Sequence, residues 1–151
     1  LVPKTVRVYP VGRLDEDSEG LMLLTNDGDL AYTLTHPKFE VPKTYHILVK
    51  GAPTNTILNS LRNGVELKEG KTSPAEVAVA RHELGNTWIS ITIHEGWNRQ
   101  VRRMCIYVGL EVLRLVRVAL GGLELGTVTS GKWRELSQAE VALLHASVKQ
   151  S

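Results

Sequence analysis

Residues 12–21 read GRLDEDSEGL, and the interpretation of the rest of the chain starts from this stretch. Gly12 and Gly20 stand near its two ends, and Asp15 follows an arginine and a leucine. The apolar residues 21–24 come directly afterwards and have the composition of a buried strand. An irregular loop tethered to a rigid element is a common way of holding a reactive group still. The pattern therefore singles out Asp15 as a candidate reactive side chain.

The composition is that of an ordinary globular domain. The chain has 151 residues, of which 42% are hydrophobic and 23% are charged, and this length is enough to bury a core within one domain. No apolar run approaches the ~20 residues that a membrane-spanning helix needs. A single cysteine excludes an internal disulfide framework and provides no metal cluster. We expect a cytoplasmic, reducing setting.

Charge is distributed unevenly, although the net charge is only +2. Residues 13–29 contain six acids against one arginine. Residues 98–118 contain five arginines against one acid, Glu111. The acidic loop and the arginine-rich segment either face each other or lie on separate surfaces, and the sequence leaves both arrangements open.

Hydrophobic periodicity and turn signals predict an α+β domain with a mixed, mainly antiparallel β-sheet and flanking helices. Strands are expected over residues 6–9, 21–25, 43–50, 75–80, 87–94, 111–120 and 133–136. Helices are expected over residues 28–35, 54–63 and 98–108, and after a capping box at 137–140. The predicted N-caps of the first three helices are Asp27, Thr54 and Asn98.

The predicted helix 98–108 has an apolar face and an arginine-rich face. Val101, Met104, Cys105 and Val108 share one side at helical spacing. Arg99 and Arg103 lie opposite, with Arg102 at the boundary. In one interpretation these arginines form a solvated surface with local pairs to Glu95 or Glu111. In the other, Arg99 and Arg103 bind phosphates while Arg102 turns inward to an acid.

Four segments together resemble a known enzyme family. Residues 13–28 fit the pattern R-L-D-x-D-S-x-G-L-x-x-L-T-N-D-G, which closely resembles the catalytic loop of pseudouridine synthases. Residues 95–104, EGWNRQVRRM, are similar to a second hallmark of these enzymes. Residues 43–45, KTY, and 117–121, RVALG, resemble two further elements. The order of these motifs over residues 6–136 is similar to the RsuA/RluB/RluE/RluF family, which modifies ribosomal RNA.

The resemblance implies a role for each matching residue. Asp15 would be the catalytic aspartate, acting as a nucleophile or as a base at the ribose, and Arg102 would pair with it. Tyr45 would lie against the target base, and Leu120 would supply an aliphatic contact to the uracil, where the family usually has isoleucine. Further substrate-binding residues would be Arg13, Leu14, Lys43, Asn98, Arg99, Gln100 and Arg103, of which Arg13, Lys43, Arg99 and Arg103 would contact phosphates. No cofactor and no metal are expected.

The same resemblance implies one catalytic domain over residues 1–151. The N-terminal S4-type RNA-binding domain that many members carry has no counterpart in this sequence. The expected function is that of a monomeric pseudouridine synthase acting on a uridine of ribosomal RNA in a loop or bulge, with 23S favoured over 16S RNA. The main alternative is an inactive RNA-binding or ribosome-assembly module of the same fold. A calcium loop starting at Asp15 is disfavoured, because Asn26 stands where a bidentate glutamate is required.

Overall fold

The structure is a computed structural model that describes residues 7–126, 128 and 132–148. Its strands are β1 (Tyr9–Pro10), β2 (Glu19–Gly20), β3 (Leu24–Thr25), β4 (Lys43–Val49), β5 (Glu66–Leu67), β6 (Gly70–Lys71), β7 (Glu76–Glu83), β8 (Asn86–Ile93), β9 (Val112–Leu120) and β10 (Leu123–Glu124). Its helices are α1 (Gly28–Thr35), the short 3₁₀ helix η1 (Pro37–Phe39), α2 (Asn55–Asn63), α3 (Gln100–Tyr107) and α4 (Gln138–Ala146).

A six-stranded sheet forms the framework of the molecule. Five strands lie in the order β10-β9-β4-β8-β7, and β2 pairs with β9 beside this path. All pairings in this sheet are antiparallel except that of β2 with β9, which is parallel. The pairs β1–β3 and β5–β6 form two separate small sheets. The predicted α+β class with a mixed, mainly antiparallel sheet is thus confirmed.

The helices begin where side chains satisfy their first backbone N–H groups. Asp27 accepts hydrogen bonds from the N–H groups of residues 29 and 30, and Thr54 accepts one from residue 57. Ser137 and Glu140 form the reciprocal capping box at the start of α4. These three N-termini are confirmed as predicted, because a short polar side chain before an apolar run is a local signal.

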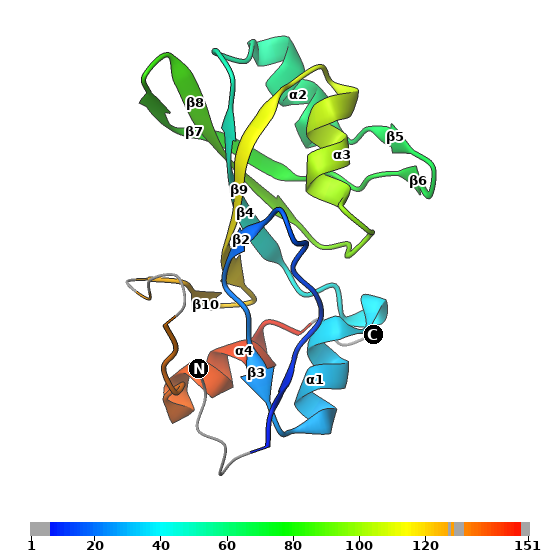
Figure 1. Ribbon diagram of the computed structural model, residues 1–151. Coiled ribbons are helices and arrows are strands. Elements are labelled where there is room, and N and C mark those ends of the chain that lie inside the picture. Colours follow the sequence, from blue (N-terminus) through cyan, green and yellow to red (C-terminus); the bar gives the residue numbers. More distant parts are fainter. Residues whose placement is uncertain (1–6, 127, 129–131, 149–151) are drawn as a thin grey trace.

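The buried side chains form two clusters. The larger one packs α2 and α3 against the sheet and contains Ile47, Leu61, Ile89 and Met104 among its fully buried members. The smaller one includes Leu34, Leu120 and Leu144 and joins α1 and α4 to the end of β9. In Figure 1, α2 and α3 accordingly lie at one end of the molecule, α1 and α4 lie at the other, and the long strands β4 and β9 connect them.

The arginine helix begins later than predicted. Its N-cap is Arg99, which has a φ of 50° and makes no side-chain capping bond, so Asn98 is not the cap. The left-handed conformation of Arg99 turns the chain before the helix starts at Gln100. The predicted apolar face is nevertheless confirmed, because Val101, Met104 and Cys105 are buried.

Two predicted strands are wrong. The apolar run after Gly20 does not form one strand over 21–25, because β2 ends at Gly20 and pairs with β9, whereas β3 (Leu24–Thr25) pairs with β1. Leu24, expected to be buried, is 40% exposed. Residues 133–136 form no strand and precede α4 as irregular chain. The predicted first strand is also displaced, since β1 starts at Tyr9 and includes Pro10, while Val6 lies outside the described residues.

Among the described residues, no helix combines the length and apolar character that crossing a bilayer requires.

Candidate active site

A cavity of about 630 Å³ collects segments that are far apart in the sequence. Its walls come mainly from residues 11–15, 34–38 and 93–102, with side chains from β4 and β9 between them. Ten of the eleven predicted site residues line it, namely Arg13, Leu14, Asp15, Lys43, Tyr45, Asn98, Arg99, Gln100, Arg102 and Leu120. The eleventh, Arg103, does not line the cavity. The fold therefore brings together residues that the sequence separates by about one hundred positions.

Asp15 lies on the loop before β2, partly buried at the wall of this cavity. Its backbone carbonyl accepts a hydrogen bond from the Ser18 N–H at 2.9 Å, which closes a tight turn. Within the described part of the chain, no ion pair involves the Asp15 carboxylate. The carboxylate thus faces a cavity without a cation bound to it.

Asp17, two residues further along the loop, is the acid that the arginine helix binds. Arg99 donates Nη1 and Nη2 hydrogen bonds to its two carboxylate oxygens at 2.8 and 2.7 Å. Arg102 donates through Nη2 to the Asp17 backbone carbonyl at 2.9 Å, and its Nε lies 3.4 Å from the carboxylate. The Arg99 hydrogen bonds, with the nearby charge of Arg102, lower the pKa of Asp17 to about 2.

This contact corrects one expectation. Arg102 was predicted to turn inward to Asp15, and it does turn inward, because its side chain is only 14% exposed. The carboxylate that it contacts, however, belongs to Asp17 rather than Asp15. The physical reason is the turn at residues 15–18, which directs the Asp17 carbonyl and carboxylate toward α3.

Tyr45 and Lys43 extend from β4 into the same cavity. Burial raises the pKa of the Tyr45 phenol, and the neighbouring Arg117 guanidinium opposes that rise. Burial also lowers the pKa of Lys43, with the positive charge of Arg117 adding to the effect. The Lys43 ammonium donates to the carbonyl groups of Val41 and Glu95, at 3.3 and 3.4 Å. Lys43 is therefore held inside the wall rather than extended into solvent.

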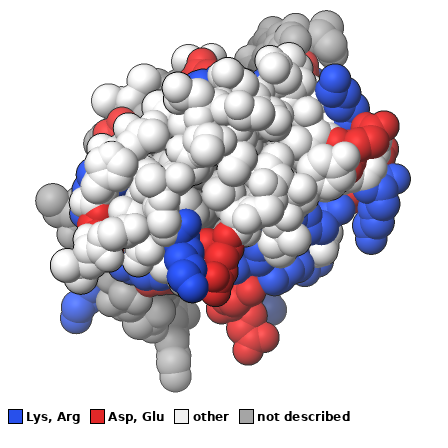
Figure 2. All heavy atoms as spheres, turned by 90° about the horizontal axis from the view of Figure 1, so that it is seen from above, with Lys and Arg blue, Asp and Glu red and all other residues white. Residues whose placement is uncertain are grey.

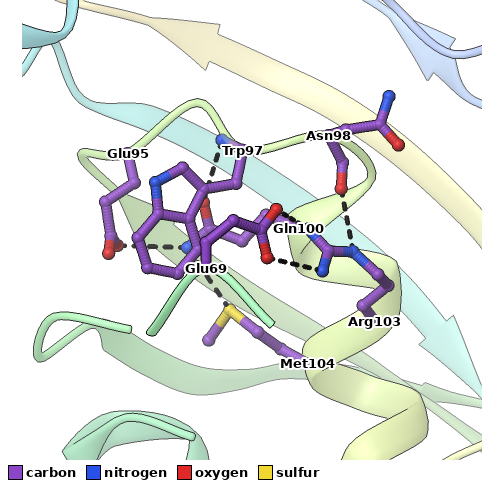
Figure 3. Close-up of polar contacts among 7 residues, drawn as sticks. All are labelled: Glu69, Glu95, Trp97, Asn98, Gln100, Arg103 and Met104. Atoms are coloured by element: carbon purple, nitrogen blue, oxygen red, sulfur yellow. Dashed lines mark hydrogen bonds and ion pairs between the residues drawn. The ribbon is translucent and has the colours of Figure 1, made fainter. Parts of the chain in front are cut away.

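Gln100 organises the turn before α3 (Figure 3). Its side-chain oxygen accepts from the Trp97 N–H at 3.3 Å, and its side-chain nitrogen donates to Glu95 at 3.1 Å. The residue is 3% exposed and also contacts the Met104 sulfur. Although Gln100 lines the cavity, its side-chain hydrogen bonds all hold the 95–100 segment in shape.

Arg103 does not line the cavity and binds Glu69 (Figure 3). Two parallel hydrogen bonds, of 2.8 and 2.6 Å, join its guanidinium to the Glu69 carboxylate. Its Nε donates to the Asn98 carbonyl at 2.9 Å. Arg99 and Arg103 thus pair with acids, as in the first of the two interpretations, but the acids are Asp17 and Glu69, which are distant in the sequence, rather than the local Glu95 and Glu111.

The acidic loop and the arginine-rich segment face each other and are in direct contact. Of the two arrangements that the sequence left open, the structure therefore has the first. Asp17 and Glu19 of the loop bind Arg99 and Arg114 respectively. Figure 2 shows acidic side chains set directly among basic ones along one edge of the surface. The arginine-rich segment is therefore partly neutralised by the protein's own carboxylates.

Comparison of the sequence with known protein families identifies one match. A family model described as RNA pseudouridylate synthase matches residues 2–107. The chain belongs to this family.

Individual members resemble the chain over most of its length. Ribosomal large subunit pseudouridine synthase E of Vibrio vulnificus is 50% identical, and the match covers 86% of this chain and 62% of that protein. Ribosomal large subunit pseudouridine synthase B of Bacillus subtilis is 47% identical over 93% of this chain and 58% of the relative. A crystal structure of a pseudouridylate synthase superposes with a TM-score of 0.81 at 31% identity, covering 91% of this chain and 59% of the other. The chain spans about three-fifths of the length of these relatives.

Two residues that matter for the geometry of this candidate site were not singled out from the sequence. Asp17 was recognised only as part of the acidic loop, and Arg117 only as part of a resembling strand. The surplus of acids in one segment and of arginines in the other was the available signal for Asp17. For Arg117, an arginine inside an otherwise apolar strand, at 115–120, was the signal, because such a residue needs partners when it is buried.

The calcium interpretation of the loop is not supported by these contacts. The carboxylates of Asp17 and Glu19, which a calcium loop would use as ligands, are bound by arginines. Among the described residues, no three histidine, cysteine, aspartate or glutamate side chains gather in a way that would hold a metal ion.

Proposed function

We propose that this chain is the catalytic domain of an RNA pseudouridine synthase that isomerises one uridine of ribosomal RNA, in large-subunit rather than small-subunit RNA. One observation carries the proposal: Asp15, Tyr45 and Arg102, from three separate segments, line a single cavity. The similarity to ribosomal large subunit pseudouridine synthases E and B favours the choice of RNA.

The reaction rearranges atoms already present in the substrate. The bond from uracil N1 to ribose C1′ breaks, the base turns, and a bond from C5 to C1′ forms. The hydrogen on C5 is lost and N1 gains a proton, so no oxidant, reductant or cofactor is needed. Asp15 acts as the carboxylate in this step, either by attacking the substrate or by removing a proton from the ribose.

The cavity suits a base that has left its stack. A volume of about 630 Å³ lies within the ~300–1,000 Å³ typical of small-molecule sites. Extruding a nucleotide costs least in a loop or bulge, which favours such a target. Tyr45 lies against the extruded base in this arrangement, and Leu120 provides an apolar contact.

Cationic side chains around the cavity hold the RNA backbone. Arg13 and Arg99 line the cavity, and Arg103 lies on α3 outside it. Since phosphate contacts fix position without reading sequence, these residues orient the strand while the cavity selects the base. The protein acts on RNA as a monomer in this scheme.

The proposal is tested with Asp15→Asn, which keeps the shape of the side chain but removes its negative charge. Ribosomal RNA transcripts carrying 5-tritiated uridine release tritium when C5 becomes bonded to the ribose. We expect the variant to bind RNA like the wild type and to release tritium at least about 1,000-fold more slowly, a loss typical of removing a principal catalytic group.

The transcripts also separate the alternatives. Release from large-subunit RNA but not from small-subunit RNA supports the stated preference, and the reverse overturns it. If the wild type binds RNA tightly but releases no tritium, the enzyme hypothesis is wrong and the alternative of an inactive RNA-binding module is supported. Unchanged turnover in a folded Asp15→Asn protein would remove Asp15 from the reaction.

A further inference from the structure

Arg117 is a buried arginine that donates hydrogen bonds to the backbone of the loop that carries Asp15. It lies on β9 and is 4% exposed. Its Nε and Nη2 donate to the Leu21 carbonyl at 2.9 and 2.7 Å, and its Nη1 donates to the Arg13 carbonyl at 3.4 Å. Residues 13 and 21 stand on either side of Asp15. One guanidinium therefore binds the backbone at both ends of the loop.

No carboxylate of the described residues lies within ion-pair distance of Arg117. This separates it from Arg99, Arg102 and Arg114, which bind acidic side chains of the loop. Burying an arginine without a counter-charge is costly unless its donors are all well used. Its planar fork with five donors suits the task of binding two carbonyl groups at once.

The backbone of the loop also touches β9 at this residue. The Leu21 N–H donates to the Arg117 carbonyl at 2.8 Å, and Gly20 pairs with Arg117 in the parallel register. A Cβ atom at Gly20 would lie 2.2 Å from the Arg117 carbonyl oxygen, and the φ of Gly20 is +112°. Only glycine allows this approach, so the loop is seated directly on the strand.

An irregularity in the sheet places Arg117 beside Tyr45. The register of β4 on β9 passes from Thr44–Ala119 to Tyr45–Arg117, so that Val118 is skipped. Without this bulge, Tyr45 would oppose Val118. Residues directly opposite each other in an antiparallel pair point to the same face of the sheet, and bulges commonly re-aim side chains near active sites. The bulge thus brings the residue that holds the Asp15 loop next to the residue that would meet the base.

We infer that Arg117 is a positioning residue for the reaction: it fixes both ends of the Asp15 loop on β9 and so sets where Asp15 lies relative to Tyr45. This inference rests on the proposed function. Catalytic groups must be held close to their productive geometry, and a displacement of ~1 Å costs on the order of 100-fold in rate. Arg117 acts through the loop and does not need to touch the substrate.

The test compares Arg117→Met with Arg114→Met. Methionine keeps an unbranched side chain but removes the guanidinium. Arg114 is the matched control, since it lies on the same strand and binds Glu19 of the same loop, at 3.0 Å. Its contact joins two half-exposed side chains, which solvent screens, and it does not reach the loop backbone.

We expect Arg117→Met to lower the single-turnover rate of tritium release at saturating RNA about 100-fold, with the Kd for RNA changed less than about twofold. Hydrogen exchange of the backbone amides of residues 13–21 should be faster in this variant. Arg114→Met should keep both the rate and the exchange of the wild type. If Arg117 had a purely structural role, Arg117→Met would lower the thermal stability but would not lower the rate while leaving the Kd for RNA unchanged.

A second variant covers the case in which Arg117→Met does not fold. Arg117→Lys keeps the charge but has one ammonium in place of the fork, and should lose at least about tenfold in rate at unchanged RNA affinity. Wild-type turnover in either folded variant overturns the inference while leaving the proposed function intact. Absence of tritium release by the wild-type protein overturns the proposed function itself, and unchanged exchange in residues 13–21 of the Arg117 variant overturns the anchoring.

Discussion

Replacing Glu69 by glutamine should make the protein bind RNA more tightly. In the free protein the Glu69 carboxylate occupies both ends of the Arg103 guanidinium, at 2.8 and 2.6 Å. Arg103 also holds the Glu69 pKa below its usual range, chiefly through these hydrogen bonds, so the pair is fully charged at neutral pH. A phosphate that approaches Arg103 must therefore displace a carboxylate. Glutamine has the same shape but no charge to compete with.

The size of the effect follows from removing one negative charge beside the phosphate site. The interaction of two unit charges ~4 Å apart in water corresponds to about a fivefold change in an equilibrium constant, so we expect a Kd about fivefold lower for Glu69→Gln. A guanidinium freed for one more phosphate also steepens the dependence of log K on log salt by about 0.7 for single-stranded RNA. The difference from wild type should shrink as the pH falls through the lowered pKa of Glu69, because the wild-type carboxylate then becomes neutral as well.

The assay is equilibrium binding of a ribosomal RNA transcript across a series of salt concentrations. Glu140→Gln is the matched control, since Glu140 binds Arg134 through an equivalent two-bond pair. That pair belongs to α4, at the opposite end of the molecule from α3 (Figure 1). The control should bind RNA like the wild type. Equal affinity and equal salt dependence in the wild type and Glu69→Gln would show that Arg103 meets no phosphate.

Two further predictions concern single groups. Burial raises the pKa of Cys105, the only cysteine of the chain, to about 12, so the native protein should not react with a thiol reagent at pH 8 and should react fully once unfolded in denaturant. Arginine lowers the Asp17 pKa from 3.8 to about 2, so the stability that Asp17 contributes should be present above pH ~4 and lost as the pH falls toward 2. Chemical denaturation of the wild type and Asp17→Asn should converge over that interval, and a constant difference would contradict the assignment.

Local signals predicted the helices well. The caps Asp27, Thr54 and Ser137 were identified correctly because each satisfies backbone groups only two or three residues away. The apolar face of α3 was likewise predicted correctly from the helical spacing of its apolar residues alone. The start of α3 was not, because the left-handed turn at Arg99 depends on Gln100 tying residues 95–97 together. The sequence does not show that the Gln100 side chain is buried and bonded to Glu95 and Trp97.

The structure of the loop at residues 12–25 could not be predicted from the sequence alone. The apolar run after Gly20 has strand composition, yet only Leu21 is hydrogen-bonded to β9, and Leu24 and Thr25 pair with β1 instead. That division depends on the close approach of Gly20 to Arg117, a contact across about one hundred residues. The partner of Arg102 was misjudged by two positions for a related reason. An acid-rich loop offers several carboxylates, and the turn at residues 15–18 decides which of them reaches α3.

The two neighbouring aspartates of the loop are suited to different tasks. Asp17 is bound by Arg99 and Arg102, and a carboxyl group with a pKa of about 2 is a weak base at neutral pH. Asp15 has no ion pair within the described chain and lines the cavity beside Tyr45. Because Arg102 binds the Asp17 carbonyl as well as its carboxylate, the charge of Arg102 fastens the loop that presents Asp15. Lysine at position 102 would keep the charge but not the fork that reaches both groups. Arg102 of α3 and Arg117 of β9 therefore both bind the backbone of one loop, and Asp15, which neither of them pairs with, is the acid of that loop that lines the cavity.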